Sequence, residues 1–313
     1  MPAEKPEKTC NPNSPVSQSD SFNPDEPETE NDFLGTDSTD DLSFELSKKK
    51  LHKEVMEMSV MDDLFARIFF RNQLLLVQQI LRILTHFPAL VLTSLSIQFD
   101  LTQLVGSHSA RLDLFAKGED GTLYNLEFDN KISRMSLKRI LYYFCSIVTY
   151  SLSAGHDYKE IPPVCIIGIV KGNIFGNKYP VNRIRLFNTT IGKVLDQMLQ
   201  WIIVDARDRQ KTPIGYLMHD FNCTNANQMH YDFMAQRMRE LKETQKGETE
   251  MNSYIEQILQ ETSEKAKKDE KLKNSREFAS RLLKLHSMSL QEISRLSDLN
   301  LQEVEMLQKK LSA

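Results

Sequence analysis

The chain has 313 residues and a formal net charge of −4, with 40% hydrophobic and 26% charged residues. Its length allows one large domain or two smaller ones, each with a buried core. The acidity is concentrated, because residues 1–46 hold twelve acidic residues against two lysines, which leaves a net charge of +6 on the remainder. A mildly basic body is compatible with a polyanionic partner but is weak evidence by itself.

Cysteine spacing and hydropathy exclude several classes of protein. The four cysteines form no C-x-x-C pair, so we expect reduced thiols in a cytosolic protein rather than a zinc site. The chain does not open on a secretory signal. Its longest uncharged run, residues 83–99, contains a proline and several polar residues, which argues against a membrane span. We therefore predict a cytoplasmic protein without membrane association.

In chain order, the predicted elements begin after a polar tail. Six of the eleven prolines lie in residues 1–46, and such a segment buries too little apolar surface to offset its chain entropy. We predict a disordered acidic tail over 1–50. Helical apolar spacing follows over 51–84, where Ser59 and Asp62 have the spacing of a helix start, and residues 90–97 read as a strand.

A β-hairpin is predicted in RLDLFAKGEDGTLYNLEFDN, residues 111–130. Glu127 and Asp129 are two residues apart and therefore share a strand face. Whether Asp113 joins them depends on the loop. A two-residue turn would pair Asp113 with Phe128, whereas a three-residue loop with a left-handed Gly121 would pair it with Glu127. Both registers are open at this point.

The rest of the chain completes a mixed α/β pattern. A long helix is predicted over 133–155, a buried strand over 163–172, and two further strands over 181–188 and 199–207. Residues from 227 onward are predicted to be helical. The end, 275–311, has the rhythm of a helix-turn-helix with a small core of five apolar residues: Ile293, Leu296, Leu299, Val304 and Leu307. Its last helix is poor in basic residues, which favours a packing or oligomerising role over DNA contact.

Three acidic side chains in one hairpin need a physical explanation. Carboxylates that cluster repel one another unless a cation lies between them, and oxygen-rich sites suit Mg²⁺, Mn²⁺ or Ca²⁺. Metal-assisted phosphodiester hydrolysis is the chemistry that most often needs such a site beside basic residues. The alternative is a solvated hairpin face. Four basic residues follow the hairpin and favour the metal site: Lys131, Arg134, Lys138 and Arg139.

At these residues the chain resembles a known family. The hairpin resembles the D…E-x-(K/Q) signature of the PD-(D/E)XK nucleases, and more narrowly it is similar to the PD-(D/E)XK nuclease family transposases, or recombination-promoting nucleases. Three further blocks carry the likeness: MDDLFARIFFRNQLLLVQQILRIL (61–84), SLKRILYYFCSIVTYSLSAGHDYKEIPPVCIIGIVKGNIFG (136–176) and PIGYLMHDFNCTNANQMHYDFMAQRMRELKET (213–244). Together they cover roughly residues 55–250.

The resemblance implies a restriction-endonuclease-like core, a mixed sheet flanked by helices, that binds Mg²⁺ or Mn²⁺ and cuts DNA. It implies Asp113 and Glu127 as metal ligands and matches Asp62 to an acid on the opening helix, where the helix dipole alone would also favour an acid. We expect a nuclease-like domain over 51–250 and a helical C-terminal extension over 251–313, a candidate oligomerisation element.

One position departs from the family pattern. Asp129 stands where the superfamily has Lys and this family usually Gln, and an added carboxylate there repels the substrate phosphate. Lys131 is two residues further and offers a migrated positive charge, while Arg134, Lys138 and Arg139 would steer phosphate. Three hypotheses remain: a DNA endonuclease associated with transposition, a catalytically degenerate DNA-binding relic, and an interaction protein that leaves the hairpin acids unexplained. The dipeptide His219-Asp220 is interpreted as structural.

Overall fold

A computed structural model of the chain describes residues 37–101, 110–131, 135–152, 155, 157–195 and 198–311. The contacts between residues divide the chain into two units, residues 1–42 and residues 43–313. Every contact described below lies within the second unit. Arg134 lies outside the described residues. No helix in the described ranges is long and apolar enough to cross a membrane.

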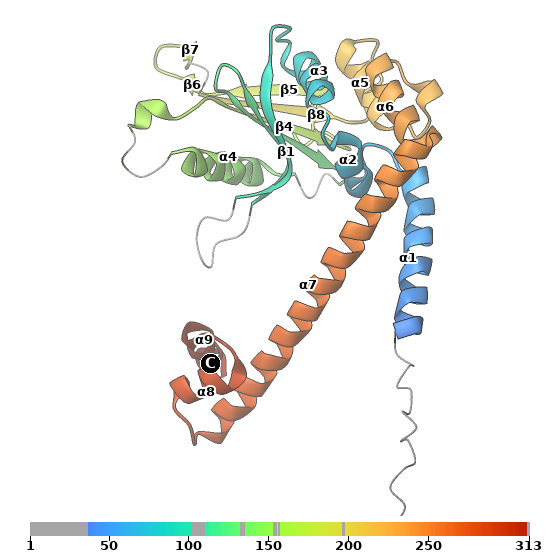
Figure 1. The fold of residues 1–313 in the computed structure, drawn as a ribbon. Helices are drawn as coiled ribbons and strands as arrows, with labels where there is room; N and C mark the ends of the chain where they lie inside the picture. The colour runs from blue at the N-terminus through green and yellow to red at the C-terminus, as the bar shows by residue number, and fades with distance from the viewer. Residues whose placement is uncertain are drawn as a thin grey trace, which may run out of the picture. The chain divides into compact units, whose positions relative to one another are not determined.

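Six strands form one mixed sheet in the order β1-β2-β3-β4-β8-β5 (Figure 1). Their bounds are β1 (Leu92–Asp100), β2 (Arg111–Gly118), β3 (Leu123–Asp129), β4 (Val164–Val170), β5 (Val181–Arg185) and β8 (Leu199–Asp205). The pairs β3/β4 and β4/β8 are parallel, and the others are antiparallel. Strands β6 (Phe187–Asn188) and β7 (Lys193–Val194) form a separate small hairpin. Each predicted strand is present, and the predicted strand over 181–188 is divided between β5 and β6.

Helices lie on both faces of the sheet and also form the C-terminal part of the chain. In the described residues the helices are α1 (Asp37–Glu57), α2 (Asp63–Phe70), α3 (Leu74–Thr85), α4 (Leu137–Ser151), α5 (Pro213–Phe221), α6 (Asp232–Glu243), α7 (Gln245–Leu285), α8 (Leu290–Ser297) and α9 (Leu301–Leu311), with 3₁₀ turns η1 (Tyr158–Glu160) and η2 (Ala226–Gln228). The α4 side chains share one core with Ile166 and Ile203. Helices α2, α3, α5 and α6 share the other core with Leu126 and Ile167. Figure 1 shows α4 and α3 on opposite sides of the sheet. The predicted mixed α/β sheet flanked by helices is confirmed and agrees with a restriction-endonuclease-like core.

Helix α1 corrects the expectation for residues 37–50, which were predicted to belong to the disordered tail. These residues are helical, because the helix continues to a fully buried Val55 that packs into the core of α2 and α3. His52 Nδ1 also lies 2.9 Å from Asn252 Oδ1 on α7. The sequence pattern missed this anchoring because it depends on a helix two hundred residues away. The domain boundaries stay a prediction.

The hairpin loop has three residues, which decides between the two registers. The N–H of Gly118 donates to Thr122 O at 2.8 Å, and Gly121 has φ +83°, the left-handed region that glycine adopts at little cost. Leu114 therefore pairs with Leu126. Continuing that register by one residue sets Asp113 opposite Glu127, so the three-residue alternative is the one found.

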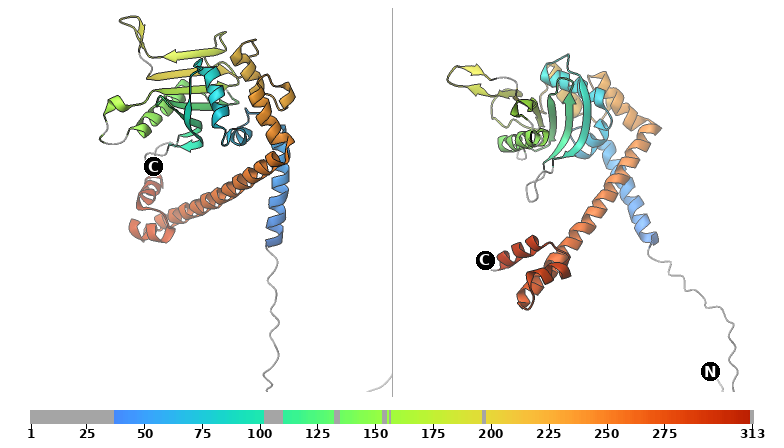
Figure 2. Two further views of the ribbon diagram at one scale, coloured as in Figure 1. Left: turned by 45° about the horizontal axis from the view of Figure 1, so that its top comes forward. Right: turned by 60° about the vertical axis from the view of Figure 1, so that its left-hand side comes forward.

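The chain ends in a small helical unit on the long helix α7 (Figure 2). Its core joins Ala279 and Leu283 of α7 with Ile293, Leu299 and Val304. Leu296, predicted in this core, is 56% exposed, because α8 turns its Ile293 side inward and Leu296 lies three residues on, at the edge of that face.

Candidate active site

The two strands of the hairpin separate where the acidic side chains begin, and those side chains replace the missing backbone bonds. The ladder between β2 and β3 extends to the pair of Leu114 and Leu126. Beyond it, the N–H of Asp113 donates to Glu127 Oε1 at 3.3 Å, and the N–H of Phe128 donates to Asp113 Oδ2 at 3.0 Å. Each carboxylate thus accepts a hydrogen bond from the other strand. This brings Asp113 and Glu127 together at the strand ends.

Glu127 and Asp129 point to the face of the sheet that α4 covers, where Arg139 meets both. Their side chains are only 3% and 6% exposed, and the Arg139 guanidinium lies 3.7 Å from Glu127 Oε2 and 3.6 Å from Asp129 Oδ2. Helix α4 fixes this position, because its N-cap Ser136 accepts a hydrogen bond from the N–H of Arg139 at 3.2 Å. Arg139 is therefore a counter-ion that bridges two motif positions.

Burial and mutual repulsion shift the protonation of the acidic pair. Burial first, and the negative charge of Asp113 second, raise the pKa of Glu127 to about 8. Burial also raises the pKa of Asp113, in spite of its hydrogen bonds from Phe128 N–H and Gln98. Both acids therefore hold their protons more strongly than ordinary carboxyl groups do, chiefly because they are buried.

Tyr143 joins the same group from the next turn of α4. Arg139 Nε donates to the Tyr143 hydroxyl at 2.8 Å, and the guanidinium lies 5.2 Å from the centre of the ring. Burial, followed by the charge of Glu127, raises the pKa of Tyr143 to about 12, so its hydroxyl keeps its proton at neutral pH. Tyr143 holds Arg139 in place, and apart from helical spacing nothing in the sequence pointed to this role.

Asn125 adds a second polar group to this face. It is fully buried two residues before Glu127, and its side-chain nitrogen and oxygen have no hydrogen bond of ordinary geometry among the described residues. The amide nevertheless lies near enough to Glu127 to favour the carboxylate form. A buried amide without a partner costs free energy unless another group satisfies it. Asn125 is therefore a buried polar neighbour of Glu127.

The remaining predicted site residues in the described part of the chain are Asp62, Lys131 and Lys138. Asp62 is itself the N-cap of α2; its carboxylate accepts from Ser59 N at 2.9 Å and Oγ at 3.0 Å, and from Asn130 Nδ2 at 3.4 Å. It is thus linked to the end of β3 through Asn130. The side chains of Lys131 and Lys138 are exposed, and the N–H of Lys131 donates to Asp129 Oδ1 at 3.1 Å.

A comparison with family models shows which protein family the chain belongs to. The model described as PD-(D/E)XK nuclease family transposase matches residues 96–296, about two thirds of the chain. The chain belongs to this family. The matched range begins in β1 and includes the hairpin acids, α4 and the chain as far as α8. No curated protein and no solved structure matches the chain. Membership of the PD-(D/E)XK nuclease transposases supports a nuclease-like function in general.

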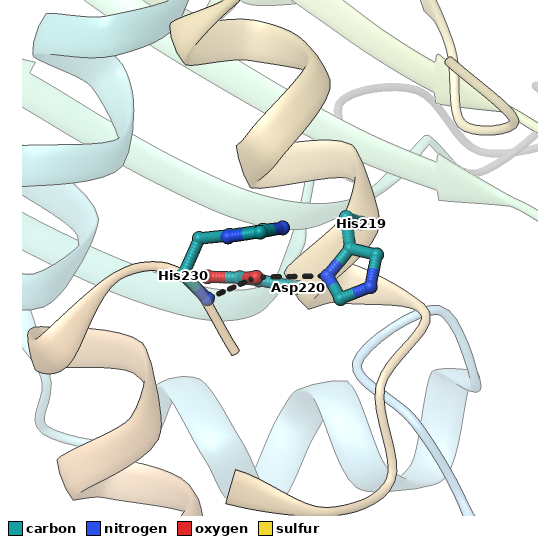
Figure 3. Close-up of side chains that lie close together, drawn as sticks. All are labelled: His219, Asp220 and His230. Atoms are coloured by element: carbon teal, nitrogen blue, oxygen red, sulfur yellow. Dashed lines mark hydrogen bonds and ion pairs between the residues drawn. The ribbon is translucent and has the colours of Figure 1, made fainter. Parts of the chain in front are cut away.

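A second cluster of chemistry-bearing side chains lies outside the acidic pair. His219 and Asp220 on α5, and His230 before α6, bring one ligand atom each within 4.8 Å of one another (Figure 3). Among the described residues, this is the set of three or more His, Cys, Asp or Glu side chains whose ligand atoms all lie that close together. Asp113, Glu127 and Asp129 do not satisfy this distance as a set of three. His230 was missed because it follows His219 by eleven residues, a spacing without a recognised pattern.

Proposed function

We propose that this PD-(D/E)XK family member is a divalent-metal-dependent DNA endonuclease associated with transposition or recombination. The observation that carries the proposal is the pairing of Asp113 with Glu127 at the point where β2 and β3 separate. Two buried carboxylates with raised pKa values are unfavourable neighbours, and a divalent cation is the ligand that would remove the repulsion. The family supplies the nuclease class, and the carboxylate pair supplies the reason for a metal.

The donor chemistry fits Mg²⁺ or Mn²⁺. Asp113 and Glu127 offer hard oxygen ligands, which these ions prefer, and the buried amide of Asn125 lies near Glu127. A bound ion would lower the pKa of a water molecule and offset charge on the phosphate. We assign metal ligation to Asp113 and Glu127. Asp129 lies 3.6 Å from Arg139 and accepts from the N–H of Lys131, so it takes up part of the positive charge that Arg139 would offer to a phosphate.

Basic side chains beside the pair are proposed to hold the DNA phosphates. Arg139 lies on the face of the acids and is 39% exposed in its side chain. Lys131 and Lys138 are exposed nearby in sequence, and Arg134 is proposed with them from its sequence position alone. Asp62, linked to β3 through Asn130, is proposed to support the site rather than to ligate the ion.

We also propose the division of the chain that the sequence suggested. Residues 51–250 would form the nuclease-like domain and residues 251–313 the helical extension, whose separate core on α7 supports a unit with its own function. An assembly of two chains through these helices is part of this proposal.

A second function is favoured by one observation. Arg139 bridges Glu127 and Asp129, so part of the charge that a metal would neutralise is already paired, and the third motif position carries an acid in place of Lys or Gln. The chain would then be a catalytically degenerate DNA-binding relic. In that case it would bind DNA with an affinity that falls with salt and would not cut it.

Replacing Asp129 separates the two candidates. Asp129→Gln removes a negative charge near the phosphate and releases Arg139, so an intact endonuclease should cleave faster by about one to two orders of magnitude. One charge about 5 Å from a phosphate oxygen corresponds to roughly 3 kcal/mol at an effective dielectric near 20. Lys131→Ala is the comparison: if Lys131 has taken over the role, its loss is damaging and Asp129→Gln changes little. No cleavage by any of these proteins, with salt-sensitive DNA binding retained, would establish the relic.

A further inference from the structure

The cluster of His219, Asp220 and His230 lies in the connection between α5 and α6. His219 and Asp220 are in the last turn of α5, and His230 follows η2 just before α6. Figure 3 shows both imidazole rings beside the Asp220 carboxylate. The rings are close, with centres 4.6 Å apart. The two ends of the loop are thus joined by three side chains with metal-binding chemistry.

The spacing of these atoms suits a transition-metal ion. His219 Nδ1 lies 3.2 Å from Asp220 Oδ1, and all three residues have a ligand atom within 4.8 Å of the others. Ligands about 2.0 to 2.2 Å from a tetrahedral Zn²⁺ lie about 3.3 to 3.6 Å from each other. The pair of His219 and Asp220, at 3.2 Å, is close to that separation. Small torsional changes of the exposed His230 side chain would complete the set.

The Nδ1 atom of His219 has side-chain partners, Asp220 Oδ1 at 3.2 Å and Cys223 Sγ at 3.5 Å, whereas backbone N–H groups hold Asp220. Its carboxylate is fully buried and accepts from the N–H groups of His230 and Tyr231, each at 2.8 Å. Those bonds would be made with any side chain at positions 219 and 230, because they use only backbone donors at the loop end. Of the two carboxylate oxygens, Oδ2 accepts only from Tyr231 among these contacts and keeps a further lone pair. An ion would therefore replace the hydrogen bond between His219 and Asp220, beside a carboxylate that the fold already fixes, and would add the exposed His230 ring as a ligand.

We propose that His219, Asp220 and His230 bind one transition-metal ion of the Zn²⁺ class. Two imidazoles and a carboxylate with an open fourth position form a ligand set typical of Zn²⁺. The site differs in chemistry from the Asp113 and Glu127 pair, which has only oxygen donors and suits Mg²⁺.

The ion would bind in the α5–α6 connection, which packs against the strand that carries the nuclease acids. Phe221, next to Asp220, accepts the N–H of Met61 with its carbonyl at 3.2 Å, and its ring lies 5.6 Å from that of Phe128. Phe128 stands between Glu127 and Asp129 on β3. A bound ion would therefore stabilise the loop that packs behind the proposed active site, with no part in the chemistry itself.

Metal binding by the full-length chain tests this proposal. The metal-stripped protein is titrated with Zn²⁺, and with Co²⁺ for its visible absorption, at constant excess Mg²⁺. We expect one ion per chain with the intense absorption of tetrahedral Co²⁺, and a higher melting temperature with Zn²⁺. His230→Ala should weaken binding at least a hundredfold and abolish the rise in melting temperature. Its fold should persist, because only the backbone N–H of His230 bonds to Asp220.

Two variants serve as controls. His52→Ala removes a histidine far along the chain, on α1, and Asp113→Asn removes a proposed Mg²⁺ ligand; both should bind Zn²⁺ as the wild type does. Failure of the nuclease proposal would leave these results unchanged, since none depends on DNA cleavage. The proposal is overturned if the wild type binds no Zn²⁺ at micromolar concentration, or if His230→Ala binds it as tightly as the wild type.

Discussion

Single residues set the charge balance of the hairpin, and Glu127 is the one whose protonation matters most. Its pKa is raised from 4.5 to about 8 by burial and then by Asp113. The folded, metal-free protein therefore holds this proton more tightly than the unfolded chain does. The stabilising contribution is complete below about pH 4.5 and is lost as the pH rises through about 8.

Comparing wild type with Glu127→Gln isolates that contribution. The free energy of unfolding of the wild type should fall relative to that of Glu127→Gln between pH 5 and 8, by about 1.4 kcal/mol for each pH unit in the linear range. Urea denaturation in the presence of a chelator measures it. Glu119→Gln, a change at an exposed acid of the hairpin loop, should show no such difference. Parallel pH profiles for wild type and Glu127→Gln would contradict the assignment.

Arg139 is the second residue with a sharp prediction. Without metal, Arg139→Gln leaves Glu127 and Asp129 buried without their counter-ion, which should lower the free energy of unfolding by about 1 to 3 kcal/mol. Saturating Mg²⁺ should recover part of that loss, because the ion replaces the missing charge. Lys138→Gln changes the neighbouring, exposed position of α4 and should alter stability by less than about 0.5 kcal/mol. A loss that Mg²⁺ leaves unchanged would argue that no cation binds beside Arg139.

At the scale of elements, the hairpin loop fixes the register on which the site depends. Gly121 has φ +83°, with open space where a side chain would begin, so Gly121→Ala should cost about 1 to 2 kcal/mol through backbone conformation alone. Gly121→Asn should cost less, because Asn tolerates the left-handed region. Chemical denaturation of the two variants checks this order. Equal stabilities would mean that the loop changes conformation on substitution.

The elements also show what a single sequence can and cannot predict. Strand periodicity was enough to find β2 and β3 and to place Glu127 beside Asp129, because residues two apart share a face. It left Asp113 open, since one loop residue more or less changes its partner. The contact of Arg139 with both acids was not predictable, because it depends on how α4 rotates above the sheet. Leu296 was misplaced for a similar reason: eight residues of α8 do not fix which edge of the helix faces α7.

At the scale of the whole molecule, the chain has more than one core. Val304 is fully buried in the small core on the end of α7, separate from the two cores of the sheet. Val304→Asp would bury an unpaired charge and should unfold α8 and α9. Hydrogen exchange should then lose protection at the end of α7 and in α8 and α9, while β3 and β4 keep theirs. Loss of protection in the central strands as well would show that the units are not independent.

The central claim is that Asp113 and Glu127 form a metal-dependent nuclease site, and plasmid nicking tests it most directly. Supercoiled DNA is incubated with the full-length protein and Mg²⁺ or Mn²⁺, and nicked product is followed for wild type, Asp113→Asn and Glu127→Gln. Wild type should nick the plasmid only with the divalent ion, and each variant should be slower by at least about a hundredfold while its fold, measured by circular dichroism, is retained. Nicking by Asp113→Asn at the wild-type rate, or nicking that persists in a chelator, would contradict the account.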